Sequence, residues 1–231
     1  MEPLRIGTRG SRLALIQAQL AQEALQGAFK GLETELKIIR TKGDRILDRP
    51  FSQVGEKGIF ASELEQALLE GEIDLAVHSA KDLPATLAFG LCIAGVLQRA
   101  DARDVLVTRK TEAKGKDTPF RLGTGSKRRV VLAQQLWENV DCRGVRGNVE
   151  TRLHKLEMGE YDALLLAKAG LDRLQIDEIS YPTLRFYPLE PALLLPAACQ
   201  GIVALEVVKE SRAFTMAAAV SHRETMLAFE V

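Results

Sequence analysis

The sequence predicts an α/β protein, with sheets that carry helices on both faces. Segments with the two-residue alternation of strands take turns with segments of helical period along the chain. This alternation occurs twice, before and after a polar segment from Arg109 to Thr118. The run Ala163–Ala167 is entirely apolar, which is typical of a strand covered on both faces. With 231 residues, the chain can bury one large or two modest cores.

The first series begins near the N-terminus. Its expected elements are a strand at Leu4–Gly7, a loop at Thr8–Ser11, a helix with Leu13, Ile16 and Leu20 on one face, and a strand at Leu36–Arg40. Residues 42–58 show no clear period. Ser62–Glu65 then fits a capping box, and Gly71 is suited to end the helix that it opens. Ile73, Leu75 and Val77 alternate as a strand requires, and Pro84 prevents its continuation.

The second series follows the polar segment. It is expected to contain a helix at Lys127–Asn139, a strand at Val140–Val145, a helix at Val149–Met158 and the strand at Ala163–Ala167. Prolines from Pro182 to Pro196 fall in a stretch of little periodicity, which suggests that the chain crosses back to the first domain. Residues 223–229 have a helical pattern. No internal repeat at a fixed period is found.

Composition excludes several classes of protein. The 31 basic and 31 acidic residues cancel, so no global field would attract nucleic acid or a membrane surface. No apolar run approaches the roughly 20 residues of a membrane helix, and the N-terminus lacks a signal-peptide pattern. Cys92, Cys142 and Cys199 are few and widely spaced, which favours a reducing compartment over a disulfide framework. No Cys or His spacing suggests a metal site.

Polar and basic residues gather where strands are expected to end or helices to begin. The four places are Thr8–Ser11, His78–Asp82, Gly123–Arg129 and Arg146–Arg152, where Asn148 is a natural N-cap. Ligands of open α/β sheets bind beyond the carboxyl ends of strands, and helix N-termini and arginine side chains bind anions. The pattern predicts a cleft for a ligand with several acidic groups, with one acid, Asp82, among the bases.

Each cluster also has a purely structural interpretation. Three groups can be ordinary surface charges or ion pairs: Arg128 with Arg129, Arg152 with Glu150, and Lys81 with Asp82. His78 fits a strand-end residue with a structural partner better than a catalytic group. Gly123-x-Gly125 is neither a dinucleotide fingerprint nor a P-loop, since Arg128 stands where the fingerprint has its third glycine.

Six motifs, which occur in one order, decide between these interpretations. They are Thr8-Arg-Gly-Ser-Arg-Leu-Ala-Leu15, Gly43-Asp44, Gly55-Glu-Lys-Gly-Ile-Phe60, His78-Ser-Ala-Lys-Asp-Leu-Pro84, Arg146-Gly-Asn-Val149 with Thr151-Arg-Leu153, and Pro196-Ala-Ala-Cys-Gln-Gly201. Together they resemble the porphobilinogen deaminase family, also called hydroxymethylbilane synthases. The likeness runs from about Leu4 to the last residue.

The resemblance implies a transferase of tetrapyrrole and heme biosynthesis. Such an enzyme condenses four porphobilinogen units head to tail, with loss of ammonia, to give hydroxymethylbilane. Asp82 matches the family's catalytic aspartate, which would accept pyrrole N–H bonds and stabilise the cationic azafulvene formed as ammonia leaves. The other matches would hold the acetate and propionate groups of substrate and cofactor. They are Arg9, Ser11, Lys57, Ser79, Lys81, Thr124, Ser126, Arg128, Arg129, Arg146, Gly147, Asn148 and Arg152, with Lys57 on a loop expected to close over the site.

The resemblance further implies two hinged domains similar to type II periplasmic binding proteins, each a mainly parallel sheet flanked by helices. Domain 1 would comprise residues 1–97 and 196–231, domain 2 would comprise residues 100–191, and the cleft would lie between them. Family members continue into a third α/β domain, where a Gly-Gly-Cys loop binds a dipyrromethane cofactor. No Gly-Gly-Cys occurs in this sequence. Because the chain stops within an apolar helical segment, we expect truncation or omission rather than a naturally short homologue.

Cys199 stands where the family pattern usually has glycine. It is either a substitute anchor for the cofactor or, as we favour, a small buried thiol. The alternatives to activity are a non-catalytic protein that binds porphobilinogen without a covalent primer, and a degenerate remnant. The clustered charges argue against a remnant. We expect a cytoplasmic monomer that binds porphobilinogen and pyrrole oligomers, and no nucleic acid, membrane or metal.

Overall fold

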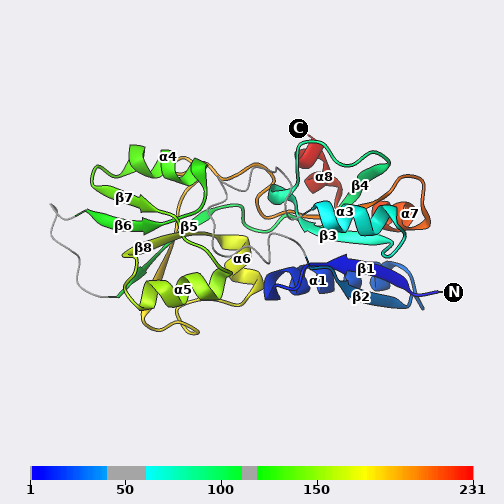
Figure 1. Ribbon diagram of the computed structural model, residues 1–231, viewed down its shortest axis with the longest axis horizontal. Coiled ribbons are helices and arrows are strands. Elements are labelled where there is room, and N and C mark those ends of the chain that lie inside the picture. Colours follow the sequence, from blue (N-terminus) through cyan, green and yellow to red (C-terminus); the bar gives the residue numbers. More distant parts are fainter. Residues whose placement is uncertain (1, 41–60, 111–118, 231) are drawn as a thin grey trace. The chain divides into compact units, whose positions relative to one another are not determined.

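Two compact units make up the part of the chain that the computed structural model describes, residues 2–40, 61–110 and 119–230. Among these residues, the first unit contains 2–40, 61–100 and 201–230, and the second contains 101–110 and 119–200. Each unit has its own five-stranded sheet (Figure 1). In each sheet one strand runs antiparallel to its two neighbours and the others are parallel to one another. The predicted α/β class with mainly parallel sheets is confirmed.

The first sheet has the strand order β2-β1-β3-β10-β4. Its strands are β1 (Leu4–Thr8), β2 (Thr34–Ile38), β3 (Leu75–Ser79), β4 (Leu91–Val96) and the antiparallel β10 (Val203–Val208). The helices of this unit are α1 (Arg12–Ala28), α3 (Ser62–Leu69), α7 (Arg212–Ala219) and α8 (Arg223–Glu230), and a 3₁₀ turn η2 (Ala80–Asp82) follows β3. Buried side chains of α1 and α7 pack on one face of the sheet, and those of α3 pack on the other.

The second sheet has the order β7-β6-β8-β5-β9. Its strands are β5 (Asp104–Arg109), β6 (Phe120–Gly123), β7 (Val140–Arg143), β8 (Ala163–Ala167) and β9 (Leu184–Pro188), and β5 is the antiparallel one. Helix α4 (Lys127–Leu136) covers one face, while α5 (Val149–Glu157) and α6 (Lys168–Arg173) cover the other (Figure 1). The core beneath α4 joins Ala133 to Leu122 and Leu165 of the sheet.

The predicted buried face of the first helix is wrong. Helix α1 buries Gln17, Ala18, Ala21 and Leu25, whereas Leu20 of the expected face is 37% exposed. The small alanines let the helix backbone approach the sheet closely, so the buried face is not the most hydrophobic one.

The expected capping box does not form, because the N-cap of α3 is Ala61 and Ser62 already lies in the helix, where its hydroxyl donates to Glu63 at 3.0 Å. Helix α4 ends three residues before the expected Asn139, since Trp137 is in extended conformation. Strand β2 lies two residues earlier than expected, and β7 ends at Arg143 rather than Val145. The strand at Ala163–Ala167 has the expected bounds.

The chain passes from the first unit to the second at residues 100–101 and returns at 200–201. The return was expected at about Pro196, but residues 196–200 pack with the second unit. The reason is Gln200, whose buried side-chain amide donates to the carbonyl oxygen of Ala102 at 2.7 Å. None of the helices in the described ranges combines the length and apolar character needed to span a bilayer.

Candidate functional site

In the first unit, the predicted site residues gather at the carboxyl ends of β1 and β3, which are adjacent parallel strands. A pocket of about 100 Å³ opens there. Its lining includes Arg9, Ser11, Ser79 and Asp82, together with Gln17 and His78. The structure therefore brings four of the predicted residues to one pocket, with Lys81 in the adjoining turn. Lys57 lies outside the described residues.

The N-terminus of α1 forms one wall of this pocket. Ser11 is the N-cap, and its hydroxyl oxygen accepts the backbone N–H of Ala14 at 3.3 Å. Thr8 at the end of β1 is buried, and its hydroxyl donates to the carbonyl oxygen of Ala14 at 3.0 Å. These contacts hold the first turn of a 17-residue helix against the strand end, so its unpaired N–H groups meet the pocket.

The turn after β3 carries the acid. Asp82 closes the 3₁₀ turn η2, in which the N–H of Leu83 bonds back to the carbonyl oxygen of Ala80 at 3.2 Å. Its side chain is exposed to solvent and lines the pocket beside the cationic Arg9. Ser79, just before the turn, accepts a hydrogen bond from the buried Gln17 amide at 2.9 Å. An exposed carboxylate beside a cation is suited to an ionic ligand that carries both signs of charge.

His78 has a structural partner. Its Nε2 lies 2.8 Å from Oε2 of Glu206 on β10, and both side chains are buried. This contact is the one expected of a strand-end histidine. His78 is also one of the residues that line the pocket.

In the second unit, the loops after β6 and β7 lie side by side. The N–H of Thr124 donates to the carbonyl oxygen of Arg143 at 2.9 Å, and a Cβ on Gly125 would lie 3.5 Å from the carbonyl oxygen of Val145. Ser126 is the N-cap of α4 and accepts the N–H of Arg129 at 3.4 Å. Two predicted clusters, Gly123–Arg129 and Arg146–Arg152, thereby meet at one edge of the sheet.

The predicted N-cap at Asn148 is confirmed. Its side-chain oxygen accepts the N–H of Thr151 at 2.8 Å at the start of α5. Gly147, just before it, has φ of +103°, and a Cβ there would lie 2.7 Å from Thr151 Cγ2, so only glycine fits. The guanidinium of Arg152 donates back to the carbonyl oxygen of Gly147 at 2.8 Å. Gly147, Asn148 and Arg152 thus form one compact cap, and Arg146 directly precedes it.

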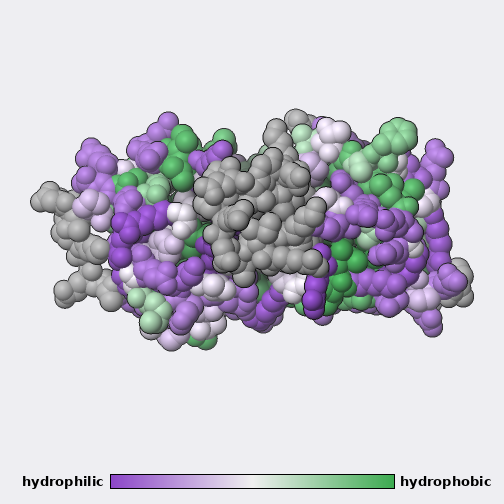
Figure 2. All heavy atoms as spheres, viewed as in Figure 1, coloured by the Kyte–Doolittle hydropathy of each residue, from purple (hydrophilic) through white to green (hydrophobic). Residues whose placement is uncertain are grey.

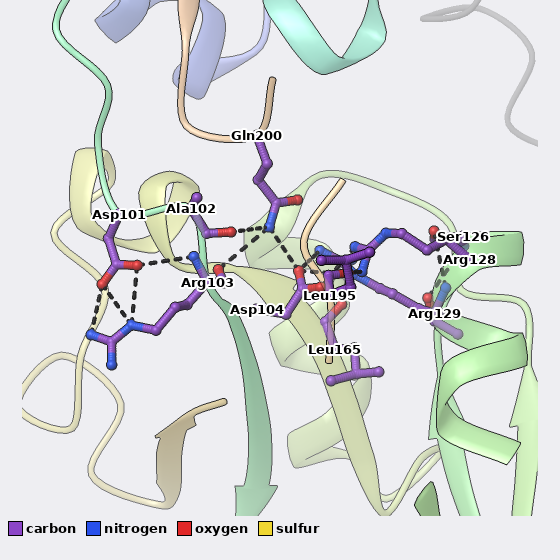
Figure 3. Close-up of polar contacts among 11 residues, drawn as sticks. Asp101, Ala102, Arg103, Asp104, Ser126, Arg128, Arg129, Leu165, Leu195 and Gln200 are labelled. Atoms are coloured by element: carbon purple, nitrogen blue, oxygen red, sulfur yellow. Dashed lines mark hydrogen bonds and ion pairs between the residues drawn. The ribbon is translucent and has the colours of Figure 1, made fainter. Parts of the chain in front are cut away.

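The guanidinium groups of Arg128 and Arg129 converge on Asp104, the first residue of β5 (Figure 3). Arg129 Nη2 lies 2.6 Å from Asp104 Oδ1, and Arg128 Nη2 lies 2.7 Å from Oδ2. Burial by itself would raise the pKa of Asp104. The charge of Arg129 and the hydrogen bonds from both arginines and Gln200 have a larger, opposite effect, so the pKa of Asp104 lies below its ordinary value. The interpretation of these arginines as solvated surface charges is wrong, because Asp104 and Arg129 are buried.

Sequence reasoning missed Asp104, Glu206 and Gln17. Asp104 pairs with Ala167 in the ladder between β5 and β8. Because β5 is antiparallel, its first residue lies at the edge where the parallel strands end. The signal that could have pointed to Asp104 was its charge directly before the apolar run Val105–Val107. The local pattern does not reveal that β5 runs antiparallel to its neighbours, and this direction is what places Asp104 at the edge with the other site residues.

The three cysteines do not provide an evident cofactor anchor. Burial raises the pKa of the Cys92 and Cys142 thiols, which lowers their thiolate fraction. Cys199, which was expected to be a small buried thiol, is half-buried and has φ of +57°. The arginine and serine clusters nevertheless fit the acidic side chains of a dipyrromethane. Within the described ranges, no group of three or more His, Cys, Asp or Glu side chains is arranged to bind a metal ion.

Comparison with known proteins places this geometry in a family. The family model described as "Porphobilinogen deaminase, dipyromethane cofactor binding domain" matches residues 4–216. A porphobilinogen deaminase of Syntrophomonas wolfei is 41% identical over 99% of this chain and 74% of its own length. Those of Roseiflexus castenholzii and Syntrophobacter fumaroxidans are 45% and 46% identical over 88% of this chain, and over 66% and 65% of their own lengths. The chain thus spans about two thirds to three quarters of these relatives.

Solved structures with the same fold are more distant in sequence. A double mutant of the BvgS VFT2 domain from Bordetella pertussis has a TM-score of 0.55, with 17% identity over 98% of this chain and 91% of that one. The substrate binding protein of an amino acid ABC transporter has a TM-score of 0.51, with 12% identity over 99% and 96% of the two chains. These likenesses show the fold, which is that of type II periplasmic binding proteins.

Proposed function

The chain belongs to the porphobilinogen deaminase family, and we propose that it binds porphobilinogen and pyrrole oligomers through the two clusters of site residues. The family's members are transferases of tetrapyrrole biosynthesis, which join porphobilinogen units with loss of ammonia. The observation that carries the proposal is the pocket of the first unit, where Asp82 and Arg9 share one lining. Porphobilinogen offers groups for both, since it has acetate and propionate side chains and becomes positively charged when its amine leaves.

Asp82 acts on the charge that develops during the reaction. Departure of ammonia leaves a cationic pyrrole with a polarised ring N–H, and a carboxylate close to that N–H accepts its hydrogen bond and stabilises the cation. The same carboxylate can exchange a proton with the reacting groups. Asp82 lies in a short turn. The residue before this turn, Ser79, is bound by Gln17, and Pro84 follows the turn, so the position of the carboxylate is restrained.

The cationic side chains hold the substrate by its acidic groups. Arg9, Ser11, Ser79 and Lys81 serve in the first unit, and Thr124, Ser126, Arg128, Arg129, Arg146, Gly147, Asn148 and Arg152 serve in the second. N-terminal turns of α1, α4 and α5 add backbone N–H donors, each beside a side chain that caps the helix. In the first unit, these contacts orient a pyrrole ring so that its reacting carbon faces the carboxylate of Asp82.

The dipyrromethane cofactor of the family supplies the primer that is extended, and its carboxylates would be held by the same arginine, serine and threonine residues. No step is assigned to a cysteine of this chain. A second candidate function, which the same experiment tests, is binding of porphobilinogen without turnover. We further propose a monomer in the cytoplasm, which agrees with the reducing compartment that the sparse cysteines indicate.

Substituting Asp82→Asn separates these functions. We expect the variant to retain measurable porphobilinogen binding but to lose at least about a hundred-fold in turnover, because an amide cannot stabilise the cation as a carboxylate does. Binding is measured by calorimetry, and turnover by porphobilinogen consumption and by uroporphyrin absorbance after oxidation.

Asp141→Asn is the matched control. It removes an aspartate whose only assigned role is an exposed pair with Arg143, and it should change neither quantity. Equal turnover by Asp82→Asn and wild-type protein would remove Asp82 from the mechanism. Binding without turnover by the wild-type chain would establish the second candidate function instead.

A further inference from the structure

The buried Asp104 has no place in the function proposed above, although it holds two residues assigned to ligand binding. We infer that Asp104 is a positioning residue, whose carboxylate sets the orientation of the guanidinium groups of Arg128 and Arg129. The inference rests on the proposed function, because it takes these arginines as part of the ligand site. It adds a residue outside the six sequence motifs.

Both oxygens of the Asp104 carboxylate are engaged (Figure 3). Oδ1 accepts hydrogen bonds from Arg129 Nη2 at 2.6 Å, Arg129 Nε at 3.1 Å and Gln200 Nε2 at 3.0 Å. Oδ2 accepts one from Arg128 Nη2 at 2.7 Å. The arginines are neighbours in the first turn of α4, and their like charges would otherwise repel. One anion placed between them holds both in fixed directions.

The two arginines are held to different extents. Arg129 is buried, and its Nη1 also donates to the carbonyl oxygen of Leu165 at 2.8 Å. Arg128 also donates through Nη1 to a backbone oxygen, that of Leu195, but it is 24% exposed, and its Nε has no acceptor among the residues that the structure describes. Arg128 therefore retains donor capacity for a ligand carboxylate, while Arg129 serves as the anchor behind it. Two guanidinium groups and one carboxylate leave a single net positive charge, which matches one carboxylate of the ligand.

A carboxylate beside an anion site has two opposite effects on ligand affinity. It reduces the positive charge that attracts an anion, and it also restricts long side chains that would lose conformational freedom on binding. If the first effect dominated, removal of the charge would tighten binding. If Asp104 acts by positioning, removal weakens binding. The sign of the change in affinity therefore distinguishes the two roles.

The test is calorimetric titration of the full chain with porphobilinogen, for the wild type and Asp104→Asn. We expect Kd to rise about ten-fold in the variant, as for loss of a hydrogen bond to a charged group. The matched control is Asp162→Asn, because Asp162 is held by Arg121 and Arg109 in the same unit in a comparable way. It should lower the unfolding midpoint but leave Kd within about two-fold, since its partners lie outside the assigned site.

A double-mutant cycle tests whether Asp104 acts through Arg128. In an Arg128→Gln background, Asp104→Asn should change Kd less than about two-fold. Should Asp104→Asn not fold, Gln200→Leu removes the neutral donor to Oδ1, together with its bond to the carbonyl oxygen of Ala102, and should weaken binding about three-fold. Unchanged or tighter binding in the folded variant, with normal binding by the wild type, overturns this inference alone. Failure of the wild type to bind porphobilinogen overturns the proposed function and this inference with it.

Discussion

Buried charged side chains in both units are held by partners that come from another strand or helix. His78 of β3 pairs with Glu206 of β10, and Asp104 of β5 pairs with two arginines of α4. A buried charge that has lost its partner costs far more than an exposed one, because neither water nor protein compensates it. The partner residues therefore support the pocket residues beside them even where they touch no ligand.

His78→Leu should show how strongly Glu206 depends on its partner. Glu206 is fully buried, its Oε2 lies 2.8 Å from His78 Nε2, and no other donor to its carboxylate is found among the described residues. We expect the variant to lose about 3 kcal/mol in the free energy of unfolding, measured by urea denaturation. The double variant His78→Leu with Glu206→Leu should recover much of this loss, because no buried charge remains.

Arg143→Leu is the control for an exposed pair, since Arg143 and Asp141 are about half exposed. Its effect should stay within about 0.5 kcal/mol. The interpretation of His78 as the compensating partner fails if His78→Leu costs no more than this control.

At the level of elements, the two units repeat one arrangement. Arg5 of β1 binds Asp74, which directly precedes β3, through its N–H at 2.8 Å and Nη2 at 2.6 Å. Arg121 of β6 binds Asp162, which directly precedes β8, through the same atoms at 2.8 and 2.9 Å. Each clasp ties one strand to a parallel neighbour, β1 to β3 and β6 to β8. In the first unit, the loops that carry the site residues leave from these two strands.

In β1 and in β6, a glycine lies two residues after the arginine of the clasp. A Cβ on Gly7 would lie 2.2 Å from Ile73 Cδ1, and one on Gly123 would lie 2.8 Å from Tyr161 Cδ1. The repeat is readable in sequence as Arg-x-Gly-Thr at residues 5–8 and 121–124, and Gly-Glu-x-Asp at 71–74 and 159–162. A search at a fixed period misses it, because the paired Arg and Asp are 69 residues apart in one unit and 41 in the other.

The clasp of the first unit should make stability depend on pH. Burial raises the pKa of Asp74, but hydrogen bonds from Arg5 outweigh burial and bring it below its ordinary value of 3.8. A carboxyl with a lower pKa in the folded state adds stability that is present above its unfolded pKa and lost as pH falls through the folded one. We expect Asp74→Asn to lower the free energy of unfolding by about 2 kcal/mol at pH 7.

This difference from the wild type should shrink below about pH 4, because the wild-type carboxyl then becomes protonated as well. Urea denaturation of both proteins at pH 7, 4 and 3 provides the measurement. A difference that stays constant down to pH 3 would contradict the assignment of the effect to the charge of Asp74.

At the level of the whole molecule, each unit has a sheet and a core of its own. All five strands of the second sheet come from the contiguous residues 101–200, whereas the first sheet needs β10 from beyond the second unit. Hydrophilic residues spread over the visible face of each unit, interspersed with smaller hydrophobic patches (Figure 2). The balance of 31 basic and 31 acidic residues leaves anion binding to local clusters.

The second unit should therefore fold by itself. We expect a fragment of residues 101–200 to show a cooperative thermal transition in far-ultraviolet circular dichroism, because its core joins Leu122, Leu165 and Ala133 without residues of the first unit. The fragment of residues 1–100 lacks β10, which lies between β3 and β4, and should show no such transition. A cooperative transition in the fragment of residues 1–100, with none in the fragment of residues 101–200, would contradict this division.

The sequence alone determined most strands and helices, the cap at Asn148, and the positions of the polar and basic clusters. These features depend on local pattern, such as alternation, capping chemistry and motif order. Four clusters were predicted at strand ends or helix starts. The structure brings two of them together in the first unit and the other two together in the second.

Only the tertiary structure decided which residues support those clusters. Asp104 and Glu206 lie on β5 and β10, the antiparallel strand of each sheet, and each of these strands directly follows a crossing between the units. The direction and register of such a strand depend on where the chain enters the sheet, and not on its own residues. A local pattern therefore identifies these acids as parts of strands, while their partners follow from the path of the whole chain.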